Sequence, residues 1–163
     1  MGDDPIGVVF ALMILLGLVT FVPMLIVQNN VDAQSRSTVE ALAQDFTDNA
    51  RSAGYITREE YQIFKNALST TGYSFHIEML HESKIVIPDE SSYIVSYNAY
   101  NFEDILNELD ENGIYEMKNG DTFSIKLTSV TPTYGSSELA ALIGGSGQKM
   151  TIPAGGMVGN SNR

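Results

Sequence analysis

The two histidines, His76 and His81, are the side chains in this sequence best suited to metal or proton chemistry. They lie in and just beyond the stretch 73–79, where apolar and polar residues alternate as in a half-buried strand. In an unbroken strand a separation of five residues places them on opposite faces, so they would not bind one metal ion. We expect each to be a single sheet or surface histidine; a break in the strand between them is the alternative.

Acidic side chains gather between Glu103 and Asp121. The first half of a calcium-loop pattern is present there, in Glu108, Asp110, Asn112 and Gly113. The twelfth position of that pattern, which needs a bidentate glutamate, is Asn119. We therefore expect a solvated helix end, with a weak cation site as the alternative.

Sequence motifs for catalysis are missing. There is no nucleophile elbow, Walker loop, dinucleotide fingerprint or His-Glu-x-x-His pattern. Residues 144–149 (GGSGQK) lack the Gly-Lys-Ser/Thr ending of a phosphate loop and are expected to form an ordinary loop. No pair of carboxylates lies in an apolar context that would suit acid–base catalysis. We expect no catalytic residue, no metal, no cofactor and no enzymatic activity.

The charge balance restricts the partners. The chain of 163 residues has 20 acidic and 9 basic side chains, a formal net charge of −11. Such a chain repels nucleic acid, so a nucleic-acid partner is not expected. It has no cysteine, which excludes disulfides and thiolate metal sites without identifying a compartment.

All the elements follow a long apolar segment, Pro5 to Val27, which is 23 residues without a charged side chain. A helix of this length spans about 35 Å, enough to cross a hydrocarbon core of about 30 Å. The basic region of a secretory signal is missing before it, so it is either a permanent anchor or an N-terminus whose leader has been removed. Its expected assembly residues are Pro5, Gly7, Phe10, Leu15, Leu16, Gly17 and Pro23.

The residues after this segment predict that the helix continues. Apolar residues from Val31 to Ala53 recur at helical spacing, with polar residues on the other faces. If the two halves are continuous, they form one helix of roughly 70 Å that ends near Gly54. Pro23 should kink this helix, because it removes one backbone hydrogen bond.

The remaining residues, 55–163, predict a small α+β head with a mainly antiparallel sheet. Thr57 and Glu60 form a capping box before a helix, and a further helix opens at Asn101 and stops at Gly113. Expected strands cover 73–79, 84–87, 93–97 and 149–153, and a short helix covers 137–143. Residues 114–117 and 122–130 flank an Asn-Gly turn and predict a hairpin. Gly155 and Gly156 suggest a bulge or a close backbone approach.

This pattern resembles a type IV pilin or pseudopilin, and its head looks most like the pilin-like proteins of Tad-type loci in Gram-positive bacteria. The matching features are the short polar N-terminus, the uncharged run Pro5–Val27, Pro23 and the amphipathic continuation. The family usually has a glutamate at the fifth mature position, where this chain has Pro5. Asp3 and Asp4 are the only acids nearby that could pair with the N-terminal amine of a neighbouring subunit.

The resemblance implies a structural subunit of an extracellular type IV pilus-like filament. The domains would then be 1–54, the long helix with halves 5–27 and 31–53, and 55–163, the head. The subunit would wait in the membrane, then join a helical homo-oligomer at the cell surface with the help of a membrane assembly machinery. The alternative is a membrane-anchored extracytoplasmic binding domain that does not polymerise. The resemblance does not indicate whether the filament serves adhesion, motility, DNA uptake or another role.

Overall fold

The structure, a computed structural model, describes residues 5–88, 93–134, 136–137, 140, 144 and 146–159. It divides into two compact units: residues 1–34 with 132–148, and residues 35–131 with 149–163. The first helix, α1 (Pro5–Ala53), contributes to both units, and its assignment is unbroken through Pro23. The predicted helix from 5 to 53 is therefore confirmed, whereas the kink at Pro23 stays a prediction.

The first unit contains the apolar part of α1. Asp32, the first charged residue of α1, accepts a hydrogen bond from the Tyr134 N–H at 3.2 Å. Thr133 donates its N–H to the Gln148 carbonyl at 3.0 Å. Most of the short helix expected over 137–143 lies outside the described residues.

The second unit is built on a four-stranded sheet of order β3-β2-β5-β6. Its strands are β2 (Phe75–Pro88), β3 (Tyr93–Asn101), β5 (Thr122–Pro132) and β6 (Lys149–Met157). β2 pairs antiparallel with both β3 and β5. The strand expected over 73–79 and the one expected over 84–87 are a single strand, because β3 pairs with β2 along its whole distal half. The α+β class and the antiparallel sheet are confirmed.

Two short strands form a separate sheet, and they correct the predicted hairpin. β4 (Ile114–Glu116) pairs antiparallel with β1 (Tyr55–Thr57), while β5 pairs with β2. The turn before Asp121 does form, with Gly120 at φ 91° and the Asp121 N–H donated to the Lys118 carbonyl. The prediction that β4 and β5 pair across it is wrong. The strands diverge because Met117 donates its N–H to the Gly54 carbonyl, which keeps β4 on β1.

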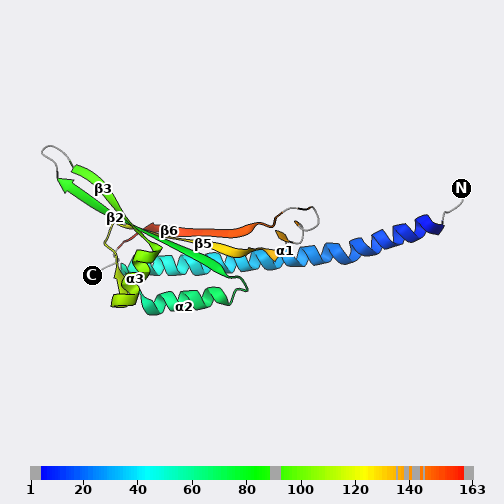
Figure 1. The fold of residues 1–163 in the computed structure, drawn as a ribbon, viewed down its shortest axis with the longest axis horizontal. Helices are drawn as coiled ribbons and strands as arrows, with labels where there is room; N and C mark the ends of the chain where they lie inside the picture. Colours follow the sequence, from blue (N-terminus) through cyan, green and yellow to red (C-terminus); the bar gives the residue numbers. More distant parts are fainter. Residues whose placement is uncertain are drawn as a thin grey trace. The chain divides into compact units, whose positions relative to one another are not determined.

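The helices of the second unit cover one face of the sheet (Figure 1). α2 (Arg58–Ser69) begins with the predicted Thr57–Glu60 capping box and buries Tyr61, Phe64 and Leu68. α3 (Phe102–Asn112) ends at Gly113, whose φ of 76° suits glycine. The ring of Phe46 on α1 stacks on Phe64 at a centroid distance of 4.3 Å.

The amphipathic half of α1 supplies a buried stripe to this core. Its buried residues are Val39, Ala43, Phe46, Thr47 and Ala50. Val31 and Ala53, which the spacing also assigned to the stripe, are exposed. From the sheet the core receives alternate residues of each strand, as a half-buried sheet requires: Ile77, Met79, Phe123, Ile125, Leu127, Met150 and Ile152.

Candidate functional site

The largest functional feature is the apolar part of α1. In the part of the chain that the structure describes, one helix is long and apolar enough to cross a membrane, at Ile6–Met24. Large apolar side chains occupy every face of this segment, since neighbours such as Leu15 and Leu16 are both exposed, Leu16 by 69%. A helix that is apolar all round is buried in lipid or among other helices. Such composition by itself is weak evidence for a membrane span, because a signal sequence shares it.

The few polar groups in this segment are compatible with an apolar environment. The Thr20 hydroxyl donates a hydrogen bond to the Leu16 carbonyl at 2.8 Å, and the Gly17 carbonyl lies 3.1 Å away. A hydroxyl satisfied within its own helix can enter lipid without an unpaired donor. Pro23 lacks an N–H, so the carbonyl of Val19, four residues earlier, loses its usual helical partner.

The predicted assembly residues differ in what the structure shows of them. Phe10, Leu15, Leu16 and Gly17 are exposed, and a Cβ built on Gly17 meets no atom within 4 Å. Within the part of the chain that the structure describes, no atom therefore requires glycine at that position. Gly7 and Pro23 are also exposed, and nothing is described of the Pro5 side chain. Asp3 and Asp4, expected to pair with a neighbouring amine, lie outside the described residues.

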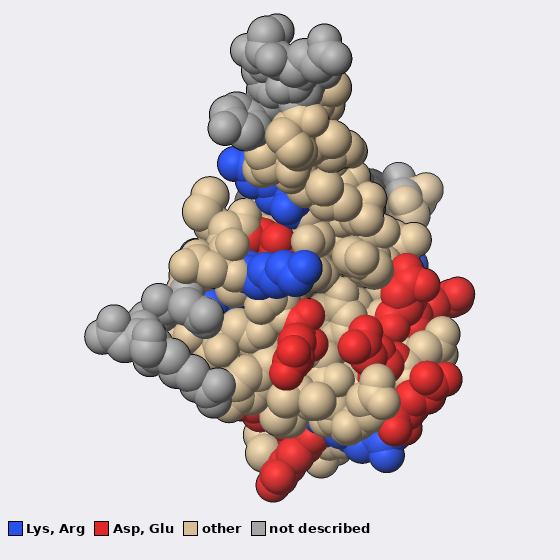
Figure 2. Space-filling view, turned by 90° about the vertical axis from the view of Figure 1, so that its left-hand side faces the viewer, with Lys and Arg blue, Asp and Glu red and all other residues tan. Residues whose placement is uncertain are grey.

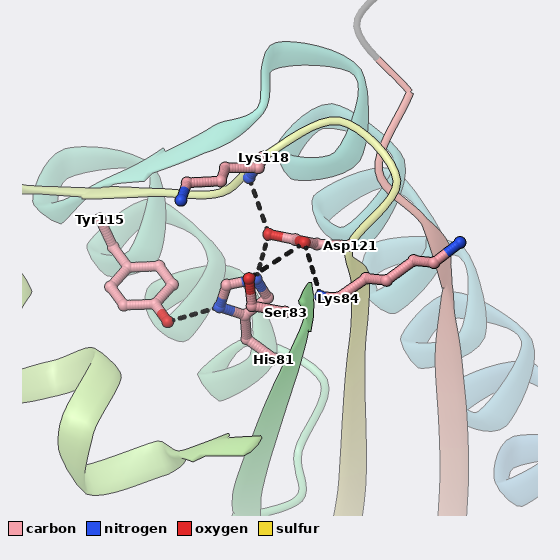
Figure 3. Close-up of polar contacts among 6 residues, drawn as sticks. All are labelled: His81, Ser83, Lys84, Tyr115, Lys118 and Asp121. Atoms are coloured by element: carbon pink, nitrogen blue, oxygen red, sulfur yellow. Dashed lines mark hydrogen bonds and ion pairs between the residues drawn. The ribbon is translucent and has the colours of Figure 1, made fainter. Parts of the chain in front are cut away.

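A buried polar cluster lies in the second unit, where His81 stands between two partners (Figure 3). Its Nε2 lies 2.9 Å from Oδ2 of Asp121, and its Nδ1 lies 2.6 Å from the hydroxyl oxygen of Tyr115. His81 and Asp121 are 4% and 2% exposed. A carboxylate oxygen can only accept, so Nε2 donates to Asp121, while Nδ1 shares a hydrogen bond with the Tyr115 hydroxyl.

Asp121 is the centre of this cluster. Besides His81, its carboxylate accepts the N–H groups of Lys118 and Lys84 and the Ser83 hydroxyl, at 2.9, 3.1 and 3.2 Å. Burial alone would raise the pKa of Asp121, but these hydrogen bonds and the one from His81 outweigh it and hold the pKa below its ordinary value. Burial, assisted by Glu108, raises the pKa of Tyr115 far above its ordinary value, so Tyr115 remains a neutral donor.

The geometry makes this cluster a structural link. Both ring nitrogens of His81 are engaged, and Asp121 accepts from four donors, so neither group has a free position for a substrate. It ties β2 to β4 and to the turn before β5. No local motif predicts this cluster, but residue alternation predicts that His76 and His81 lie on opposite faces, and the exposed His76 and buried His81 confirm this. Asp121 ends the acidic stretch that begins at Glu103, which the sequence predicts to be a solvated helix end.

The calcium-loop pattern lies in a helix instead of a loop. Residues 102–112 form α3, and Asp110 pairs with Arg58 at 2.8 Å. A helix cannot wrap its side chains around a cation as a calcium loop does. Among the described residues there is no group of three or more metal-ligating side chains. Acidic side chains do gather on the face shown in Figure 2, with few basic ones between them.

Two of the open hollows in the second unit lie beside the elements described above. One of about 300 Å³ lies between α1 and α2 and is lined by Phe46, Ile63 and Phe64 among others. The other, of about 670 Å³, lies over β2, β5 and β6, where Lys126 pairs with Glu78 at 2.6 Å. The hydrogen bond from Lys126 lowers the pKa of Glu78, so Glu78 is ionised at neutral pH. Neither hollow holds a cluster of catalytic side chains.

The predicted close backbone approach is confirmed at Gly155, whereas Gly156 lies against the Arg51 side chain. A Cβ on Gly155 would lie 2.6 Å from the Ser124 Cβ, and one on Gly156 would lie 2.6 Å from the Arg51 guanidinium carbon. Arg51 also donates to the Met157 carbonyl at 2.9 Å. These contacts fasten β6 to β5 and to α1.

Comparison of the chain with protein-family models, curated proteins and solved structures finds no match, so no family is assigned by comparison.

Proposed function

We propose that this protein is a subunit of a type IV pilus-like filament, assembled through the apolar part of α1. The observation that carries the proposal is the exposure of large apolar side chains all round Ile6–Met24. A segment of this kind needs lipid or other helices around it in every direction. In the proposed cycle it lies first in the membrane and then among the same helices of other copies.

The layout of α1 supports a helix that lies first in the membrane and later in a filament core. Its apolar part is followed without a break by a half that packs into the core of the second unit. Gly17 leaves open space on the helix, which allows a neighbouring helix to approach closely. Contacts between identical helices that do not close on themselves generate an open helical filament. The N-terminal acid of the resembling family is replaced here by Pro5, so subunit order would depend on apolar packing or on Asp3 and Asp4.

The alternative function is a membrane-anchored domain that does not polymerise. The same apolar segment supports it, because a single helix of this length is sufficient for an anchor. The two functions differ in whether the helix ever leaves the lipid. Material sheared from producing cells therefore separates them.

The test examines sheared material by electron microscopy and by blotting for this chain. Filaments that contain the chain are expected, and recovery only from the detergent-extracted membrane favours the anchor. Leu16→Lys should abolish filaments, because it places a charge in an apolar core. Ile63→Lys, which adds the same charge at a side chain of α2 that is 61% exposed, is the matched control.

A second variant separates packing from membrane insertion. Gly17→Leu keeps the segment apolar, so membrane insertion should persist while close helix packing is blocked. We expect membrane-bound subunit and few filaments from Gly17→Leu, with Gly17→Ala less affected. Filaments of normal number and shape from Leu16→Lys would contradict the proposed core.

A further inference from the structure

The distal half of β2 and its partner β3 form a two-stranded arm without the support of the other strands. β5 pairs with β2 only as far as Glu82, while β3 follows β2 to Pro88. The ribbon extends beyond β5 and β6 in Figure 1. A lone two-stranded ribbon is marginally stable in water.

The arm is apolar on both faces. On the face that continues the core lie Ile85, Ile87 and Ile94, and all three are exposed. On the opposite face lie Val86, Val95 and Tyr97, of which Tyr97 is 60% exposed. Neither face has a cover within the described second unit. Exposed apolar surface of this kind marks an interaction site.

The backbone of β3 adds an open edge to these faces. Lys84 donates its N–H to Asp121, on the β5 side, so the backbone groups of Lys84 point away from β3. Lys84 lies opposite Tyr97, which makes this a non-hydrogen-bonded pair. The N–H and C=O groups of Val95, Tyr97 and Ala99 therefore point outward, away from β2. No described strand pairs with this row, and another strand can extend it.

The two edges of the sheet are treated differently. β6, the other outer strand, contains Lys149 and Pro153, and Arg51 bonds its Met157 carbonyl. Charge, proline and a covering side chain are the usual means of blocking an edge. β3, with the sequence YIVSYNAYN, has no charge and no proline over nine residues. The contrast between the blocked edge at β6 and the open edge at β3, on the opposite side of the sheet, indicates that β3 has a partner.

Charge favours a second copy of this chain as that partner. The chain has a net charge of −11, so two copies repel over most of their surfaces. The described arm has one charge, the positive Lys84. A second copy that approaches through β3, which has no charged residue, meets less repulsion there than over the acidic surfaces.

We infer that β3 of one copy pairs antiparallel with β3 of a second copy, through a two-fold contact. The residues of β3 whose backbone groups point outward have odd numbers, and each pairs with another odd-numbered residue of the second copy. The sum of two odd numbers is even, so the two-fold axis lies at one residue position, where that residue faces its own copy. The contact closes at two copies and does not build the filament. It would join subunits pairwise, for example between neighbouring filaments, and it does not depend on the proposed function.

The chain has no cysteine, so each disulfide dimer of this chain in a cysteine scan must form through the introduced residue. Single cysteines are placed at each position from Ile94 to Asn98 in the full chain, extracted in mild detergent and oxidised. A disulfide needs Cβ atoms about 3.5–4.5 Å apart, whereas diagonal neighbours across strands are about 7–8 Å apart. Dimers should therefore peak at one position and fall at both of its neighbours. Ile63→Cys on α2 and Lys149→Cys on the blocked edge are exposed controls.

A second change tests whether the backbone edge is used. The Ala99 N–H points outward, so Ala99→Pro removes no hydrogen bond between β2 and β3 but blocks a strand added outside. In the background of the best cross-linking cysteine, Ala99→Pro should reduce the dimer at least tenfold, while Ala99→Ser should leave it. Unchanged circular dichroism shows that the fold is retained.

Three results would overturn the inference. They are a dimer yield no higher than that of the controls, equal yields at adjacent positions, and cross-links only to another protein. A filament-negative chain that still gives the single-position peak would reject the proposed function alone. Filaments without that peak would reject only the pairing of β3.

Discussion

Removal of the Asp121 carboxylate is the sharpest test of the buried cluster. In Asp121→Ala the donors from His81, Lys118, Lys84 and Ser83 lose their shared acceptor. An unsatisfied buried donor costs about 1–3 kcal/mol. His81 has the least access to water, while the other three are partly buried and regain part of the loss from water.

We therefore expect Asp121→Ala to lower the free energy of unfolding by about 3 kcal/mol, within the range for breaking a buried pair. That is a large part of the ~5–15 kcal/mol typical of a domain. Urea unfolding of the full chain in detergent micelles, followed by near-ultraviolet circular dichroism of its eight tyrosines, measures the loss. Amide hydrogen exchange at Lys84 and Lys118 should accelerate most, because their N–H groups lose the carboxylate.

Asp110→Ala is the matched control. Asp110 pairs with Arg58, but its side chain is 74% exposed, and exposed pairs contribute about 0–1 kcal/mol. If Asp121→Ala destabilises the protein no more than Asp110→Ala does, the cluster is not the link that we describe. Local exchange that stays unchanged at Lys84 and Lys118 would also refute this interpretation.

Two further predictions concern the same unit. The folded pKa of Asp121 lies below its ordinary value of 3.8, so its ionisation stabilises the fold above that value, and the contribution is lost as the pH falls through the folded pKa. The difference in unfolding free energy between the native chain and Asp121→Asn should therefore be smaller at pH 3 than at pH 7. An equal difference at the two pH values would contradict this prediction. Gly155→Ala should destabilise by about 1–3 kcal/mol in thermal unfolding, since its Cβ would meet Ser124 and the Phe123 carbonyl within 3 Å, whereas Gly159→Ala, in open space, should be near neutral.

Local signals in the sequence were sufficient for most elements. The Thr57–Glu60 box and Gly113 fixed the limits of two helices, because caps depend on neighbouring residues alone. The apolar run predicted a helix long enough to cross a membrane, and Ile6–Met24 has that length and composition and is exposed within the described residues. The face of each strand followed from alternation, as the burial of Phe123, Ile125 and Leu127 confirms.

Pairing between strands could not be predicted in the same way. The Asn-Gly turn at Gly120 suggested a hairpin, and the turn is present, but long-range bonds to Gly54 and His81 direct its two sides to different sheets. A turn signal reports the backbone over four residues and carries no information about partners at a distance. The open edge of β3 likewise appears only once the strand order is known.

Periodicity and composition are sufficient to predict the apolar helix from Pro5, its amphipathic continuation and the α+β class, because both act within a few turns of chain. The contact between Asp121 and His81, which are forty residues apart, and the position of β3 at an unblocked edge arise in the folded chain. Those two features arise from strand register, and register is set by the whole core rather than by any one segment.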